Sequence, residues 1–130
     1  MEVKVKIDCD IDKFYDVIVK STLDDINRVL KTDKKELKEG FEYEKKYDKK
    51  NSEKIKIKKL IKNKCYESIT TRNGVDYSLL YRFETNENGN YVIFSQGDSL
   101  NTKYSKLKEF LFKRSAKSTI YSIVDYIKSI

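Results

Sequence analysis

The chain has 130 residues, with 28 lysines and arginines against 21 aspartates and glutamates, and its formal net charge is +7. This length suits one domain, residues 1–130, that buries a sizeable core without disulfides or metal. With no histidine and only two cysteines, Cys9 and Cys65, the composition excludes triads of the Ser-His-Asp type, a disulfide framework and a cysteine-rich zinc site.

The first third of the chain predicts a strand followed by a helix. Residues 2–8 alternate between apolar and charged side chains, as in a half-buried strand. Asp10 then stands where a helix cap is expected. Residues 31–40 are polar and end at Gly40, a position suited to a chain reversal. Between them, one helix or two short ones, of about five turns in all, is indicated by apolar or small side chains at spacings of three and four: Ile11, Phe14, Tyr15, Ile18, Thr22, Ile26 and Val29.

Residues 41–95 predict an antiparallel sheet of at least four strands, because stretches of period two alternate with polar turns. A bulge is expected near residues 58–59, where the alternation changes phase. Asn73 and Gly74 are the strongest hairpin signal, since both tolerate the positive φ of a type I′ turn. The last strand is expected to end before Gly97. The strands are expected to begin near Phe41, Ile55, Cys65, Tyr77 and Tyr91.

A final helix is predicted over residues 102–127, and it carries two apolar stripes. Tyr104, Leu107 and Leu111 share one face. Nearly the opposite face carries Phe112, Ala116, Ile120, Ile123 and Ile127. The helix therefore bends near residues 113–118, or its first turns face something other than the sheet. We expect the three isoleucines to be buried against the sheet, with Tyr104 and Leu107 packed elsewhere.

Motifs that would carry catalysis or bind a metal are not found. Asp8, Asp10 and Asp12 resemble the first ligands of a calcium loop, but its sixth position is Lys13 and its twelfth is Val19. We interpret these aspartates as a strand end and a helix cap. The glycines are isolated, so no phosphate-binding loop is indicated. We therefore expect no catalytic residues, no metal and no cofactor, and a protein that is not an enzyme.

A basic surface is the first feature that could carry function. Lysines are frequent between residues 45 and 64, and Lys54, Lys56 and Lys58 are its candidate residues. Such a surface could bind nucleic acid or an acidic protein. Nucleic acid is not the expected partner, because the chain has only four arginines and arginine is best matched to phosphate and guanine. The alternative is a solvated sheet face whose lysines block edge-to-edge pairing.

Tyrosines on successive predicted strands are the second feature. A buried hydroxyl needs a hydrogen-bond partner, so several tyrosines facing one interior are easier to satisfy beside a wet or ligand-filled cavity. The alternative is an ordinary aromatic core that fills the space. We expect a cavity between the sheet and the last helix, lined by Tyr77, Leu79 or Tyr81, Phe83, Tyr91 or Ile93, and Ile120 or Val124.

Three segments resemble an uncharacterised bacterial family, the domain of unknown function 3284: LKEGFEY at residues 37–43, KIKI at residues 54–57, and Tyr66. The order of strand, helix, antiparallel meander and long final helix is similar to the START or Bet v 1-like (SRPBCC) helix-grip fold. The resemblance implies an α+β fold in which a curved sheet wraps the last helix, with an apolar cavity between the two. It carries no family active site onto this chain.

These observations lead to one expected function and two alternatives. We expect a cytoplasmic protein that binds a small apolar or aromatic ligand between its sheet and its last helix. No stretch approaches the roughly 18 apolar residues of a membrane span, and no leader is recognised at the start. The alternatives are the basic surface described above and a homo-oligomer whose sheet edge or last helix is an interaction surface; the oligomeric state stays open.

Overall fold

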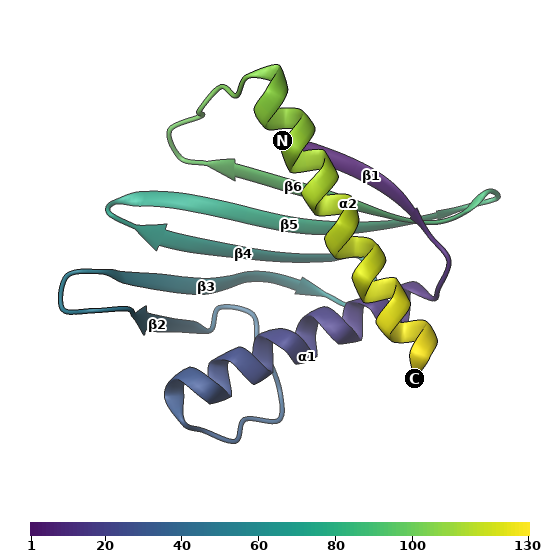
Figure 1. The fold of residues 1–130 in the computed structure, drawn as a ribbon. Helices are drawn as coiled ribbons and strands as arrows, with labels where there is room; N and C mark the ends of the chain where they lie inside the picture. Colours follow the sequence, from purple (N-terminus) through teal and green to yellow (C-terminus); the bar gives the residue numbers. More distant parts are fainter.

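The computed structural model describes all residues, 1–130, as one curved antiparallel sheet with two helices (Figure 1). The strand order is β1-β6-β5-β4-β3-β2, so the first strand pairs with the last and closes one edge of the meander. This confirms the predicted α+β helix-grip architecture. The elements are β1 (Glu2–Ile7), α1 (Ile11–Leu30), β2 (Glu42–Lys46), β3 (Ser52–Ile61), β4 (Cys65–Arg72), β5 (Val75–Asn86), β6 (Gly89–Asp98) and α2 (Lys106–Ser129).

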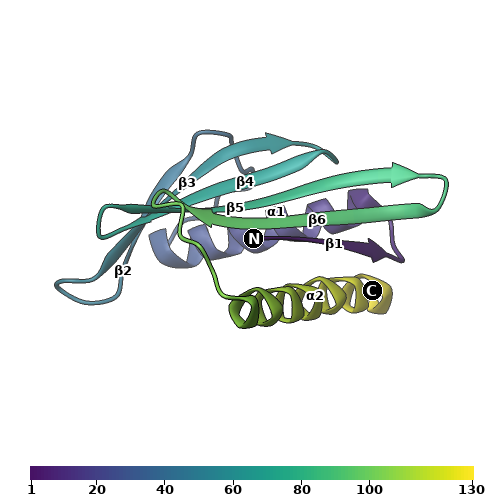
Figure 2. The same cartoon turned by 90° about the horizontal axis from the view of Figure 1, so that it is seen from above.

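Both helices lie on the same side of the sheet (Figure 2), and α2 crosses the strands diagonally (Figure 1). Alternate side chains of a strand point to opposite faces, so every strand gives one set of residues to this inner face. The core lies between these side chains and the helices. Its largest fully buried members are Phe14 and Ile26 of α1, Ile57 of β3, Val92 of β6 and Ile120 of α2.

The turn chemistry follows the sequence closely. Asn73 and Gly74 have φ values of 52° and 76° and join β4 to β5, which confirms the hairpin. The register of β3 against β4 shifts between Ile57 and Lys59, which confirms the bulge. The expected end of β6 before Gly97 is wrong: Gly97 pairs with Ser78 and the strand continues to Asp98. Gly97 does not adopt a positive φ, so the backbone stays extended there and its N–H and C=O groups can continue the ladder.

The first helix has the predicted length, but its cap differs. Asp10 is the N-cap residue, yet its side chain accepts no hydrogen bond from the helix. The helix begins instead with the backbone bond from Phe14 N–H to the Asp10 carbonyl, at 3.2 Å. It ends at Lys31, a residue in the left-handed conformation with φ of 55°.

The second helix is uninterrupted from Lys106 to Ser129 and starts later than predicted. The Asp98 carboxylate accepts hydrogen bonds from the N–H groups of Leu100 and Thr102, which holds the preceding residues as a loop. Ser105 caps the helix by accepting from the Lys108 N–H at 3.2 Å. Neither helix of the structure combines the length and the apolar character needed to cross a membrane.

The two apolar stripes of α2 differ in how far they are buried. Ile120 and Ile127 are buried, whereas Leu107 is 67% exposed and Leu111 is 50% exposed. The first turns therefore face away from the sheet, which is the second of the two predicted outcomes. Ile123 is half-buried and packs against the edge of the core. Full burial was expected for it, but Val124 occupies the more central position.

Candidate ligand-binding site

A pocket of about 240 Å³ lies between the inner face of the sheet and the middle of α2. Its walls are mostly apolar and include no ionisable acid or base other than a tyrosine. Three neutral polar side chains complete them. The lining residues are Leu79, Tyr81, Phe94, Gln96, Phe112, Ser115, Ala116, Thr119 and Ile120.

The sheet wall comes from two neighbouring strands. Tyr81 of β5 pairs directly with Phe94 of β6, and Leu79 pairs with Gln96. Directly paired residues of antiparallel strands point to the same face, so these four side chains form one continuous floor. The Tyr81 and Phe94 rings are in contact, with 4.8 Å between centroids.

The helix wall has the spacing of one α-helical face. Phe112, Ala116 and Ile120 recur every four residues and point at the sheet. Phe112 stacks on Phe94 with 5.7 Å between centroids and an interplanar angle of 16°, which closes one end. Ala116 is buried, and its single methyl group leaves room that a larger side chain would fill. Ser115 and Thr119 are exposed, so the pocket opens to solvent beside α2.

Tyr81 is the one polar group on the floor that lies deep in the protein. Only 8% of the residue is exposed, and its hydroxyl has no hydrogen-bond partner within the chain. No buried polar side-chain atom is left unpaired anywhere in the protein, so this hydroxyl keeps access to solvent. Burial raises its pKa to about 12. At neutral pH the hydroxyl is therefore protonated and available to donate.

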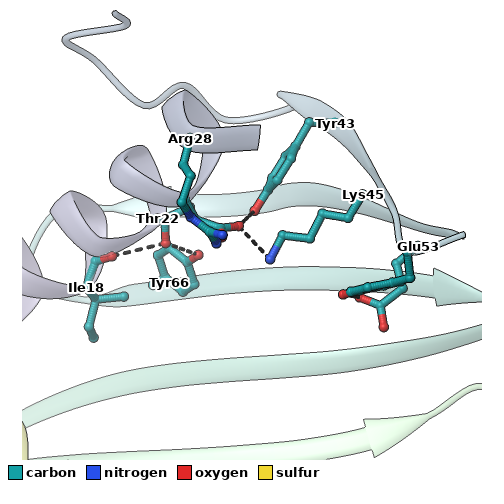
Figure 3. A network of polar contacts seen from close by, with 9 residues as sticks. Ile18, Thr22, Arg28, Tyr43, Lys45, Glu53 and Tyr66 are labelled. Carbon is teal, nitrogen blue, oxygen red and sulfur yellow. Dashed lines mark hydrogen bonds and ion pairs between the residues drawn. The ribbon is translucent and has the colours of Figure 1, made fainter. Parts of the chain in front are cut away.

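The other polar cluster beneath the sheet is already satisfied (Figure 3). Asp25 of α1 accepts from the Tyr43 hydroxyl at 2.7 Å and pairs with Lys45 at 2.8 Å and Arg28 at 2.6 Å. Burial opposes the charge of Asp25, but hydrogen bonds from Lys45 and Tyr43 outweigh it and hold the carboxyl pKa below its usual value. This cluster joins α1 to β2, and each of its groups has a partner within the protein.

The predicted cavity residues fall into three groups. Leu79, Tyr81 and Ile120 line the pocket. Phe83 packs edge-on against Phe14, with 5.9 Å between centroids, and so belongs to the core beneath α1. Val124 is a buried core residue of α2. Tyr77 lies on the inner face but is 38% exposed, with the Arg72 guanidinium 5.1 Å from its ring.

The expectation that Tyr91 or Ile93 lines the cavity is wrong. Both face the outer side of the sheet, where Tyr91 pairs with Glu84 and Ile93 pairs with Arg82. The four residues 91–94 are all apolar or aromatic, so alternation could not distinguish the inner pair from the outer pair. Pairing with β1 determines which pair faces the core, because Phe94 and Val92 stand opposite Val3 and Val5, which are buried in it.

Six pocket residues were not predicted: Phe94, Gln96, Phe112, Ser115, Ala116 and Thr119. The helix residues carried a usable signal, because positions 112, 116 and 120 continue one stripe at a spacing of four. Phe94 and Gln96 required the strand register. No group of three or more cysteine, aspartate or glutamate side chains in the protein is placed to hold a metal ion.

The basic residues singled out in the sequence lie on β3. Lys54 and Lys56 point to the outer face, where Glu42 approaches them at 3.8 Å and 3.9 Å. Lys58 is exposed within the bulge. All three side chains are solvated, and Lys54 and Lys56 share Glu42 as an acidic neighbour.

Comparison with known proteins identifies the family and the fold. The family model "Domain of unknown function (DUF3284)" matches residues 1–117. No curated protein sequence matches the chain. Among solved structures, Ara h 8.0201 superposes with a TM-score of 0.61 at 12% identity, over 100% of this chain and 97% of its own. The Aha1 dimer from Colwellia psychrerythraea gives 0.59 at 19% identity, over 98% and 94%.

A third similar structure is DynU16, described as a protein of the dynemicin biosynthetic locus. Its TM-score is 0.64 at 7% identity, and the match covers 98% of this chain but only 46% of DynU16. This chain therefore spans less than half of that protein. At these identities the similarity concerns the fold, which is that of the Bet v 1-like helix-grip proteins.

Proposed function

The chain belongs to the DUF3284 family, and from its pocket we propose that it is a non-enzymatic cytoplasmic protein that binds a small, neutral, aromatic or apolar ligand. The observation that carries the proposal is the Tyr81 hydroxyl, a protonated donor without a partner on the floor of an uncharged pocket. A ligand with one acceptor atom would supply the missing hydrogen bond.

Volume and charge restrict the class of ligand. The pocket, at about 240 Å³, lies just below the range of about 300–1,000 Å³ that is typical for drug-sized molecules. One substituted ring fits this space better than a sterol or a long acyl chain. No lysine, arginine, aspartate or glutamate lines the pocket, so a charged ligand would lose its hydration without gaining a counter-charge.

Thermal unfolding in the presence of candidate ligands tests the proposal. We expect stabilisation by small phenols, indoles or similar neutral rings, and none by fatty acids, sterols or nucleotides. A ligand present at 100 times its dissociation constant should add about 2.7 kcal/mol to the free energy of unfolding. No stabilisation by any class, together with a crystal structure whose interior is filled, would contradict the proposal.

Two variants connect any binding to this pocket. Tyr81→Phe removes the hydroxyl donor and should weaken a ligand that accepts from it by about 1 kcal/mol. Ala116→Leu fills the pocket and should abolish binding. The matched controls are Tyr77→Phe, which removes a hydroxyl outside the pocket, and Ser118→Leu, which adds the same leucine on an exposed position of α2. Both controls should bind like the unmodified protein.

A further inference from the structure

The first turns of α2 and the loop before them expose a group of large apolar side chains. We call this group the α2 apolar face: Leu100, Leu107, Phe110 and Leu111. Their exposed fractions are 69%, 67%, 60% and 50%. Positions 107, 110 and 111 have the spacing of one helix face, so their side chains lie together. In Figure 1 these turns reach beyond the strands at the upper edge of the sheet.

This face is separate from the ligand pocket. Phe112, Ala116 and Ile120, on the other side of the same helix, already contact the sheet or line the pocket. The beginning of α2 is therefore apolar on two opposite sides, and only one of them is covered. Contiguous exposed apolar side chains of this kind are uncommon on a surface that faces only water, and they often mark an interaction site.

Unpaired positive charge surrounds the α2 apolar face. Between residues 99 and 118 the only acidic side chain is Glu109. The ten ion pairs of the protein use none of the basic side chains in this segment. These side chains are Lys103, Lys106, Lys108, Lys113, Arg114 and Lys117.

We propose that the α2 apolar face binds the surface of an anionic lipid bilayer, with the first turns of α2 lying in the plane of the interface. A bilayer offers an apolar layer beneath negative head groups, which matches exposed leucine and phenylalanine side chains flanked by lysines. A second copy of the chain fits less well, because it would bring two sets of six unpaired cations together. The proposal does not depend on the ligand pocket.

Co-sedimentation of the full chain with vesicles tests it. We expect binding to vesicles that contain phosphatidylserine and little or none to pure phosphatidylcholine. The double variant Leu107→Ser, Phe110→Ser should lower the partition coefficient by about tenfold or more, since both side chains would leave the membrane. The triple variant Lys106→Gln, Lys113→Gln, Arg114→Gln should weaken binding and flatten its dependence on salt.

Matched controls place similar changes elsewhere on the surface. Tyr47→Ser with Ile61→Ser removes two exposed apolar side chains, which are 63% and 46% exposed. Lys46→Gln, Lys49→Gln, Lys50→Gln removes three positive charges at the β2–β3 turn. Both controls should bind vesicles as the unmodified protein does. The substituted side chains of the two test variants are exposed, so their thermal unfolding should be unchanged.

Three results would overturn the proposal. Failure to sediment with phosphatidylserine vesicles would leave an acidic protein segment as the better occupant. Equal losses in the test and control variants would mean that binding follows overall charge and not this face. Self-association in analytical ultracentrifugation that Leu107→Ser abolishes would identify the face as an interface between copies of the chain.

Discussion

Four tyrosines are buried in this protein, and their hydroxyl groups have different surroundings. Tyr43 donates to Asp25, and Tyr66 shares a hydrogen bond of 2.8 Å with Thr22. The hydroxyls of Tyr15 and Tyr81 make no hydrogen bond within the chain, and only Tyr81 lines the pocket. The sequence cannot separate these roles, because each depends on which side chain lies opposite. Tyr43 and Tyr66 anchor α1, whereas the Tyr81 hydroxyl lines the pocket without a partner in the chain.

Asp25 should contribute stability that depends on pH. Its folded-state pKa lies below the usual value of 3.8, so the contribution is complete above the unfolded-state pKa. It is lost as the pH falls through the folded-state pKa. Asp25→Asn should therefore cost about 1.5–3 kcal/mol at pH 7 and much less in strong acid. Urea unfolding from pH 7 down to acid measures this difference.

The matched control for Asp25 is Asp33→Asn. Asp33 also pairs with a lysine, Lys35, at 3.0 Å, but the two side chains are 85% and 82% exposed. An exposed pair of this kind contributes little to stability. Equal losses in the two variants, or a loss in Asp25→Asn that does not change with pH, would contradict the assigned role of Asp25.

At the scale of elements, α2 shows how one helix serves two environments. Its second half packs on the sheet through Ile120, Val124 and Ile127, whereas its first half turns apolar side chains outward. No bend is needed, because the exposed stripe and the stripe of Phe112, Ala116 and Ile120 lie on opposite sides of one helix, and only the second faces the sheet. The two stripes in the sequence therefore correspond to two surroundings of one continuous helix: the sheet on one side and solvent on the other.

This arrangement predicts unequal costs of truncation. Ile120 is 1% exposed, so Ile120→Ala should cost about 2–5 kcal/mol through lost burial and a cavity. Leu107→Ala should stay within about 0.5 kcal/mol, as for other surface substitutions. Guanidinium unfolding curves of both variants give the comparison. Similar losses would mean that the first turns of α2 are covered in solution.

At the scale of the whole molecule, the formal net charge is +7, and one group of unpaired basic side chains lies on and just before the first half of α2. Most of the ion pairs join exposed side chains, and such pairs contribute little to stability. The outer-face lysines of β3 share Glu42 as a neighbour. A net charge of this kind affects solubility and attraction toward anionic surfaces. It does not by itself determine which partner the protein binds.

We expect no binding of duplex DNA at physiological ionic strength, because the β3 surface has lysines but no base-reading arginine side chains. The variant Lys54→Gln, Lys56→Gln, Lys58→Gln should behave like the unmodified protein in fluorescence anisotropy. A sub-micromolar, salt-dependent complex whose salt dependence this variant flattens would reverse the interpretation.

The sequence by itself determined the order and type of the elements. Periodicity and turn chemistry are local properties, so they predicted both helices, the strands of the meander, the Asn73-Gly74 hairpin and the bulge near Lys59. The helix-grip resemblance added the global arrangement. Local patterns were also enough to exclude histidine chemistry and a calcium loop.

Only the tertiary structure decided the inner face of β6 and the shape of the pocket. Residues 91–94 are apolar or aromatic throughout, so the side facing the core depends on pairing with β1 and β5. The pocket exists because Ala116 of α2 stands above the Tyr81–Phe94 pair of the sheet. That position depends on where the helix crosses the strands. A crossing point is set by packing between distant segments, and no periodicity within one segment encodes it.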